Sequence, residues 1–101
     1  MTDNIFNQDE IKYLKDFNKW IEGLLLQIKN ENDNDVKRIF RNNIADYIKK
    51  ANDENDDLLK KVFNGFFDTN GYGWEELLKP TFFDTTMEDY VYKSNEFLKD
   101  K

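Results

Sequence analysis

The stretch QDEIKYLKDFNKWIEGLLLQIK, residues 8–29, decides the fold class. Its apolar residues recur at steps of three and four, which places them on one face of an α-helix. The stripe consists of Leu14, Phe17, Ile21, Leu24 and Ile28, widened by Tyr13 and Trp20. Asn7 is placed to cap this helix, and Asp9 and Glu10 fall in its first turn, where the helix dipole favours acids. The segment therefore predicts a long amphipathic helix.

Two further segments have helical spacing. The sequence predicts a second helix over residues 35–50 and a third over residues 56–67. The expected buried face of the second is Val36, Ile39, Phe40, Ile44, Tyr47 and Ile48. That of the third is Leu58, Leu59, Val62, Phe63 and Phe66. The acidic breaks at residues 30–35 and 51–57 each precede a helix, so we interpret their acids as caps rather than as cation sites.

The only proline and two of the four glycines lie in FFDTNGYGWEELLKPTFFDTT, residues 66–86. DTNGYG predicts a turn, and WEELLK predicts a short helix that stops at Pro80, because a residue before proline avoids the helical region. A last helix is expected over residues 86–99, started by the capping box Thr85-Thr86-Met87-Glu88. Its inner face would be Met87, Tyr90, Val91, Ser94, Phe97 and Leu98. The prediction is one all-α domain, residues 1–101, a small bundle of four helices plus one short helix near 74–79.

The composition excludes several chemistries. There is no Cys and no His, so disulfides, thiol catalysis and the commonest general base are missing. No Gly-rich phosphate loop or catalytic motif occurs, and we expect neither enzyme activity nor a cofactor. The start of the chain does not resemble a signal peptide, and the longest apolar run, residues 24–26, is far short of a membrane span. We expect a cytoplasmic protein without membrane contact, in the host cytoplasm if a phage encodes it.

The glycine turn invites comparison with a calcium-binding EF-hand loop. Counted from Asp68, the positions of Asn70 and Gly73 match that pattern. Tyr72 and Lys79 break it, since Lys79 stands where a bidentate Glu supplies much of the affinity. We therefore interpret the segment as a turn after a helix and predict no metal site.

Charge is distributed unevenly. The net charge is −6, and residues 68–96 hold seven acids and two bases, whereas residues 1–67 hold 13 acids and 11 bases. The basic cluster Lys37, Arg38 and Arg41 is small for a nucleic-acid site and lies in a negative domain. We interpret it as a solvated face with Asp35 nearby, and we expect no direct nucleic-acid binding.

The acidic, aromatic-rich C-terminal third, residues 68–96, is the candidate partner-binding region. Glu88, Tyr92 and Glu96 are four residues apart, so they share a helix face opposite the Val91 side. Tyr and Trp dominate the hot spots of protein interfaces, although these aromatics could instead close the end of the bundle. The candidate residues are Tyr72, Trp74, Glu75, Glu76, Phe82, Glu88, Asp89, Tyr92 and Glu96.

Small size, acidity and the lack of catalytic motifs favour a protein-binding inhibitor. Its expected partner is a protein with a basic surface, such as a nuclease, as in phage anti-defence proteins of the anti-CRISPR type, nuclease-immunity proteins or DNA mimics. The alternative is a structural or regulatory helical module that acts as a homodimer or assembly subunit. A bacteriocin-type immunity protein is a third, lower-ranked interpretation.

Overall fold

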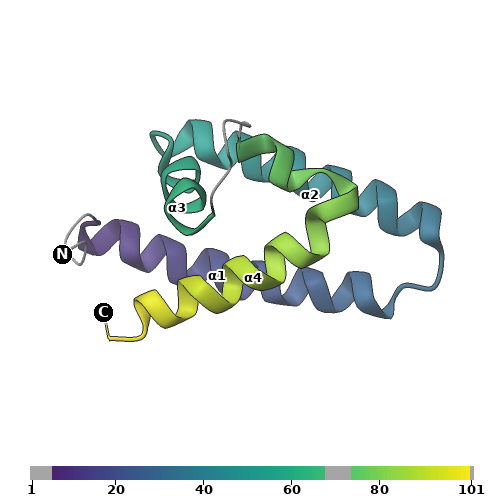
Figure 1. Ribbon diagram of the computed structural model, residues 1–101, viewed down its shortest axis with the longest axis horizontal. Coiled ribbons are helices and arrows are strands. Elements are labelled where there is room, and N and C mark those ends of the chain that lie inside the picture. Colours follow the sequence, from purple (N-terminus) through teal and green to yellow (C-terminus); the bar gives the residue numbers. More distant parts are fainter. Residues whose placement is uncertain (1–5, 68–73, 101) are drawn as a thin grey trace.

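The structure, a computed structural model, describes residues 6–67 and 74–100. Its elements are α1 (Gln8–Asn30), α2 (Asn34–Glu54), α3 (Leu58–Phe66), the 3-10 helix η1 (Trp74–Leu78) and α4 (Pro80–Leu98). No strand occurs in these ranges, which confirms the predicted all-α fold of four helices and one short one. In Figure 1, α1 and α2 form a hairpin, α4 returns along α1, and α3 lies across the end of the hairpin.

The start of α1 forms as the sequence predicts. The Asn7 side chain accepts a hydrogen bond of 2.8 Å from the Glu10 backbone N–H, and the Glu10 carboxylate accepts one of 2.9 Å from the Asn7 N–H. This reciprocal capping box satisfies two backbone donors that a helix start leaves without partners. The predicted stripe is buried along α1, with Leu24 half-buried and Trp20 at the margin.

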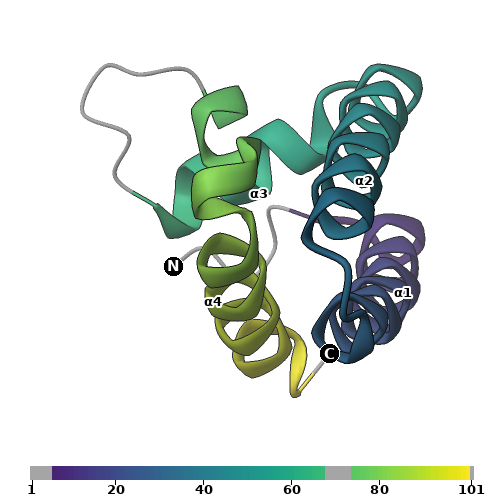
Figure 2. The same cartoon turned by 90° about the vertical axis from the view of Figure 1, so that its right-hand side faces the viewer.

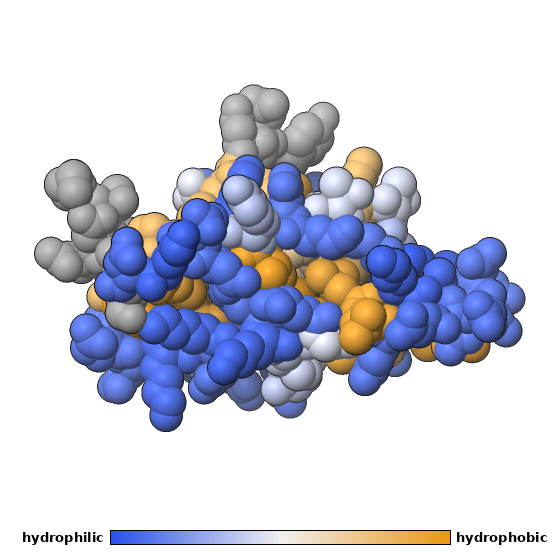
Figure 3. Space-filling model, turned by 90° about the horizontal axis from the view of Figure 1, so that it is seen from below, coloured by the Kyte–Doolittle hydropathy of each residue, from blue (hydrophilic) through white to orange (hydrophobic). Residues whose placement is uncertain are grey.

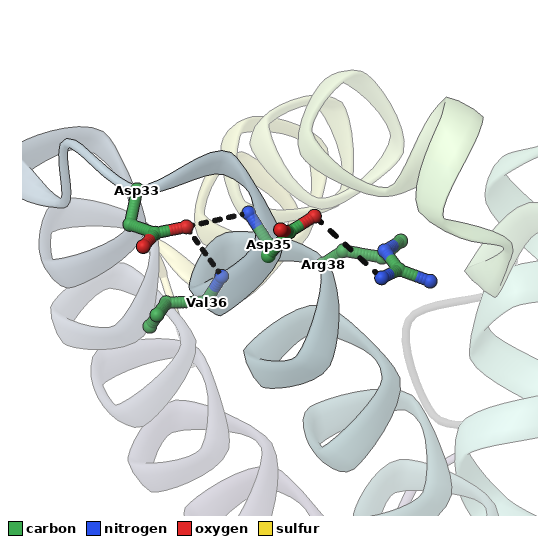
Figure 4. A network of polar contacts seen from close by, with 4 residues as sticks. All are labelled: Asp33, Asp35, Val36 and Arg38. Carbon is green, nitrogen blue, oxygen red and sulfur yellow. Dashed lines mark hydrogen bonds and ion pairs between the residues drawn. The ribbon is translucent and has the colours of Figure 1, made fainter.

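The first acidic break caps α2, also as predicted. One carboxylate oxygen of Asp33 accepts hydrogen bonds from the backbone N–H groups of Asp35 and Val36, at 2.9 and 3.3 Å (Figure 4). In the first turn of α2, Asp35 forms an exposed ion pair with Arg38 at 3.7 Å. Acids here therefore satisfy the helix start, which agrees with their interpretation as caps.

The buried face of α2 differs from the prediction. Ile44 and Ile48 are buried and Phe40 is half-buried, but Val36, Ile39 and Tyr47 are exposed. The face that contacts the core instead contains Ile44, Ala45, Ile48, Ala51 and Asn52. Through this side α2 packs against α3 and α4. The larger apolar residues on the adjoining arc remain largely exposed.

The turn between α2 and α3 is built by a buried asparagine. Asn52 accepts a 2.7 Å hydrogen bond from the Lys60 N–H, in the first turn of α3, and donates one of 2.9 Å to the Asp57 carboxylate. Asp56 and Asp57 adopt left-handed backbone conformations with φ of 55° and 62°. The third helix therefore begins at Leu58, two residues later than predicted, because these residues form the turn.

Pro80 starts α4, which corrects the predicted boundary. Lys79 is extended (φ −65°, ψ 146°), as expected before proline, and Pro80 is the first helical residue. Proline suits that position because its φ is preset and its missing N–H would have no intrahelical partner. The predicted capping box around Thr86 is wrong, since those residues lie inside the helix. The predicted inner face is correct, with Met87, Tyr90, Ser94 and Leu98 buried and Val91 and Phe97 partly buried.

Aromatic rings join the elements at the centre of the core. The Tyr90 ring of α4 stacks on the Phe63 ring of α3 with centroids 4.6 Å apart, and the Phe17 ring of α1 meets Tyr90 edge-on at 5.9 Å. At the end of the bundle, Phe6 meets Phe97 edge-on at 5.9 Å, so the start of α1 lies beside the end of α4. These contacts fix the antiparallel arrangement of α1 and α4.

Candidate partner-binding groove

A groove with a volume of about 680 Å³ runs between α1 and α4. Its apolar lining consists of Leu25 and Leu26 from α1 and of Val91 and Tyr92 from α4. Leu26 and Tyr92 are well exposed, at 59% and 69% of their surface. Figure 3 shows apolar surface between two rows of polar side chains on the side of the molecule formed by α1 and α4. The two helices thus present an apolar furrow with a polar rim.

Charged side chains form that rim. They are Glu22 and Lys29 from α1, Lys37 from α2, and Asp84 and Glu88 from α4. Two of the acids already have partners, since Arg41 binds Asp84 and the Asn95 side chain donates to Glu22 at 3.2 Å. Glu88 is exposed and forms no ion pair within the described residues. It is therefore the rim acid most available to an incoming cation.

A buried polar contact holds the two walls of the groove together. Asn18 of α1 donates hydrogen bonds to the Ser94 hydroxyl at 2.8 Å and to the Asn95 side-chain oxygen at 3.1 Å. Both Asn18 and Ser94 are almost fully buried. Because a buried polar group without a partner costs free energy, this contact favours one register between α1 and α4. That register places Tyr92 beside the leucines of α1.

The groove unites only part of the predicted site. Glu88 and Tyr92 line it together, whereas Glu96 and Asp89 are exposed on α4 outside it. Asp89 lies 4.0 Å from Lys93, at the limit of an ion pair. Phe82 is exposed near the start of α4, and its neighbour Phe83 is buried. The groove therefore contains two of the three residues of the predicted helix face, Glu88 and Tyr92, and not the third, Glu96.

The remaining candidates lie elsewhere. Glu75 and Glu76 line a separate hollow between α2 and η1, and Glu76 pairs with Lys79 at 2.7 Å. Trp74 is buried, with its ring 5.7 Å from that of Phe63. The structure therefore removes Trp74 from the candidate surface and assigns it to the core. Tyr72 and the glycine turn compared with a calcium loop lie outside the described residues.

Sequence reasoning missed the α1 wall of the groove. Leu25 and Leu26 were not among the candidates, although they follow the predicted stripe residue Leu24 directly. Successive residues in a helix point about 100° apart, so three consecutive leucines cannot all face one core. The run of three leucines was therefore the feature of the sequence that could have indicated this wall. Its significance depends on α4 lying alongside, which the spacing within α1 cannot reveal.

Comparison with known protein families, with characterised proteins and with solved structures returned no match. Over residues 6–67 and 74–100, no helix is both long enough and apolar enough to cross a membrane. The same residues contain no group of three or more Asp, Glu, His or Cys side chains arranged to hold a metal ion. The case for function therefore rests on the surface of the protein.

Proposed function

We propose that this protein is a non-enzymatic binding domain that covers a basic surface on another protein and thereby blocks it. The binding surface would be the groove between α1 and α4 together with the acidic face of α4. The observation that carries the proposal is the position of Tyr92, which is 69% exposed and lines the groove with Leu25, Leu26 and Val91. An aromatic side chain on an apolar floor with a charged rim is the usual composition of an interface hot spot.

Charge favours a basic partner. Residues 74–100 contain seven acids and three bases, a balance of −4, and Glu88, Asp89 and Glu96 are exposed on α4. Such a field accelerates encounter with a positively charged surface, and the apolar contacts then slow dissociation. Nucleases and other nucleic-acid-handling proteins present basic working surfaces. We therefore propose this class as the target, with inhibition following from occupation of that surface.

Capture experiments with matched variants test the proposal. The immobilised protein should retain a basic partner at low salt and release it as salt screens the opposite charges. Tyr92→Ala should abolish capture, whereas Phe82→Ala, which removes an exposed aromatic of the same helix outside the groove, should retain it. Addition of the wild-type protein should inhibit the nucleic-acid-handling activity of the captured partner, and Tyr92→Ala should not.

Two outcomes would contradict the proposal. Equal capture by wild type and Tyr92→Ala would show that the groove is not the binding surface. Capture of an acidic partner, or capture that is insensitive to salt, would exclude the charge-based choice of target. Both variants need a circular dichroism spectrum and a melting curve like those of the wild type, so that loss of binding is not loss of folding.

A further inference from the structure

The end of α3 carries a pair of residues that is chemically labile. Asn64 and Gly65 form one of the two Asn-Gly pairs in the chain, and the other, residues 70–71, lies outside the described residues. Asparagine is a labile residue because its side-chain amide can be lost as ammonia. Glycine in the next position favours that reaction, since it has no Cβ to hinder the approach of its backbone nitrogen. Asn64 and Gly65 are both exposed, so solvent reaches them freely.

The reaction needs only this pair of residues and water. A base removes the proton of the Gly65 N–H, and the nitrogen bonds to the side-chain carbonyl carbon of Asn64. That carbon releases its amide group, which gains a proton and leaves as ammonia, so a cyclic imide remains. Water then opens the imide at the side-chain carbonyl to give aspartate, or at the main-chain carbonyl to give isoaspartate. In either product a carboxylate has replaced the amide, at the cost of one water consumed and one ammonia released.

The helical backbone of α3 blocks that attack. Asn64 and Gly65 lie in the last turn of the helix, which ends at Phe66. The ladder of helical hydrogen bonds continues past them, since the Phe67 N–H donates to the Phe63 carbonyl oxygen at 2.9 Å. Helical dihedral angles direct the Gly65 N–H along the helix axis, towards the carbonyl oxygen four residues earlier and away from the Asn64 side chain. Attack therefore requires a rotation of the Asn64 main chain that opens the last turn.

Contacts with α4 hold that last turn closed. Lys93 of α4 donates a hydrogen bond of 3.2 Å from Nζ to the Phe66 carbonyl oxygen, and its ammonium lies 4.8 Å from the centroid of the Phe67 ring. The last carbonyls of a helix lack intrahelical partners and form its negative end, so a lysine stabilises them. The Phe66 ring also packs against the rings of Tyr90 and Phe97, at 6.3 and 6.1 Å. These contacts join α3 to α4 on the side of the molecule away from the hairpin of α1 and α2 (Figure 2).

We propose that Asn64 is a site of spontaneous deamidation and that the contact of Lys93 with the end of α3 controls its rate. The reaction proceeds from the opened last turn. Because opening and closing are fast relative to the chemistry, the rate equals the intrinsic rate multiplied by the fraction of molecules that are open. Isoaspartate makes the opening permanent, since it inserts an extra main-chain carbon and interrupts the helical hydrogen bonds. The change is one-way and frees the end of α3 from Lys93.

Peptide mapping of the full chain by mass spectrometry tests the proposal. The wild type is incubated at mildly alkaline pH in native buffer and, separately, unfolded in guanidinium chloride. Digestion with chymotrypsin, which cleaves after Phe66 or Phe67, separates Asn64 from the second Asn-Gly pair. Asn64 should deamidate at least about tenfold more slowly in the folded chain than in the unfolded chain, because only a small fraction of the folded molecules is open at this turn.

Two variants separate the role of the contact from that of the residue pair. Lys93→Met keeps the aliphatic stem but removes the hydrogen bond to Phe66, so deamidation at Asn64 should accelerate about threefold. The matched control Lys19→Met removes an exposed lysine of α1 and should leave the rate unchanged. Gly65→Ala should slow the reaction and raise the melting temperature, because an added Cβ there meets no atom within 4 Å and alanine favours the helix.

Amide hydrogen exchange checks that the opening is local. In Lys93→Met, exchange of the Phe67 N–H, which bonds to Phe63 across the last turn, should accelerate by the same factor as deamidation. Exchange of the Ile48 N–H, in the buried centre of α2, should stay at the wild-type rate. Faster exchange at both positions would show global unfolding and would overturn the assignment of the effect to this turn.

Three results of the mapping would also overturn the proposal. Absence of deamidation at Asn64 in the unfolded chain would show that the pair is not reactive. Equal rates in the folded and the unfolded chain would show that α3 does not protect it. Equal rates in Lys93→Met and Lys19→Met would show that Lys93 does not control the last turn.

Discussion

Arg41 of α2 donates two parallel hydrogen bonds to the carboxylate of Asp84 of α4, both 2.8 Å long. The guanidinium Nε donates to one carboxylate oxygen and a terminal nitrogen donates to the other, which is the planar geometry that arginine provides and lysine does not. The hydrogen bond to Asp84 is the main reason that the pKa of Arg41 is raised. Arg41 and Asp84 are 43 positions apart in the sequence, so this contact links α2 to α4. It also holds Asp84 at the rim of the groove.

The Arg41–Asp84 pair should contribute measurably to stability. Arg41 is 20% and Asp84 42% exposed, so solvent screens the pair in part, and we expect Asp84→Ala to cost about 1 kcal/mol in the free energy of unfolding. Arg41→Lys should recover little of the interaction, because an ammonium cannot bind the carboxylate through two nitrogens. Urea unfolding of both single variants and the double variant measures the coupling. The exposed pair of Arg38 with Asp35, at 3.7 Å, is the control and should couple by no more than a few tenths of a kcal/mol.

Truncation to alanine should destabilise the protein strongly at Trp74 and very little at Tyr92. Trp74 is buried against Phe63, so Trp74→Ala leaves a cavity and should cost about 3–5 kcal/mol of stability. Tyr92 is exposed, and Tyr92→Ala should change stability by no more than about 0.5 kcal/mol. Thermal melts followed by circular dichroism separate the two. A large loss for Tyr92→Ala would show that this side chain is structural, and its role in the groove would need another explanation.

Asn52 should be a structural residue despite its polar side chain. It is buried, and it satisfies the Lys60 N–H at the start of α3 while it binds the Asp57 carboxylate. Asn52→Ala leaves that donor without its partner, and we expect a loss of about 1–2 kcal/mol. Asn43→Ala, at an exposed position of α2, is the matched control and should change the stability little. Equal effects of the two changes would contradict the capping role of Asn52.

The protein should lose stability at alkaline pH through Tyr90. Burial is the main cause of a raised pKa for the Tyr90 phenol, from an ordinary value of 10.0, and the nearby Ser94 lowers it by less. Below pH 10 the phenol is neutral in both the folded and the unfolded chain. Above pH 10 the unfolded chain releases this proton while the folded chain keeps it, so stability falls as pH rises, by up to about 1.4 kcal/mol per pH unit.

Denaturant unfolding between pH 8 and 12 measures that loss. Tyr90→Phe keeps the ring that stacks on Phe63 and removes the ionisable group, so its stability should fall less steeply above pH 10. Burial also raises the pKa of Tyr13, so part of the slope should remain in that variant. Tyr92→Phe, at an exposed position, is the control, and its stability should fall above pH 10 as steeply as that of the wild type. An unchanged slope in Tyr90→Phe would contradict the assignment to Tyr90.

The number of helices and much of their inner surface could be predicted from the sequence. The helical spacing of α1, the Asn7 cap and the inner face of α4 around Tyr90 all appear in the structure as predicted. These are local properties. A cap depends on residues three apart, and an apolar arc depends on residues three and four apart, so both are encoded within a single element.

The features that the sequence did not predict depend on which helices pack against one another. The sequence by itself determined that α2 has an apolar arc, but only the tertiary structure decided that its alanine side is buried and that Ile39 and Tyr47 are left uncovered. Likewise, Leu26 and Tyr92 each lie at a predictable place on their own helix, but the groove exists only because α1 and α4 pack side by side. The physical reason is that periodicity within a helix defines a direction for each side chain, whereas burial depends on which distant part of the chain occupies that direction.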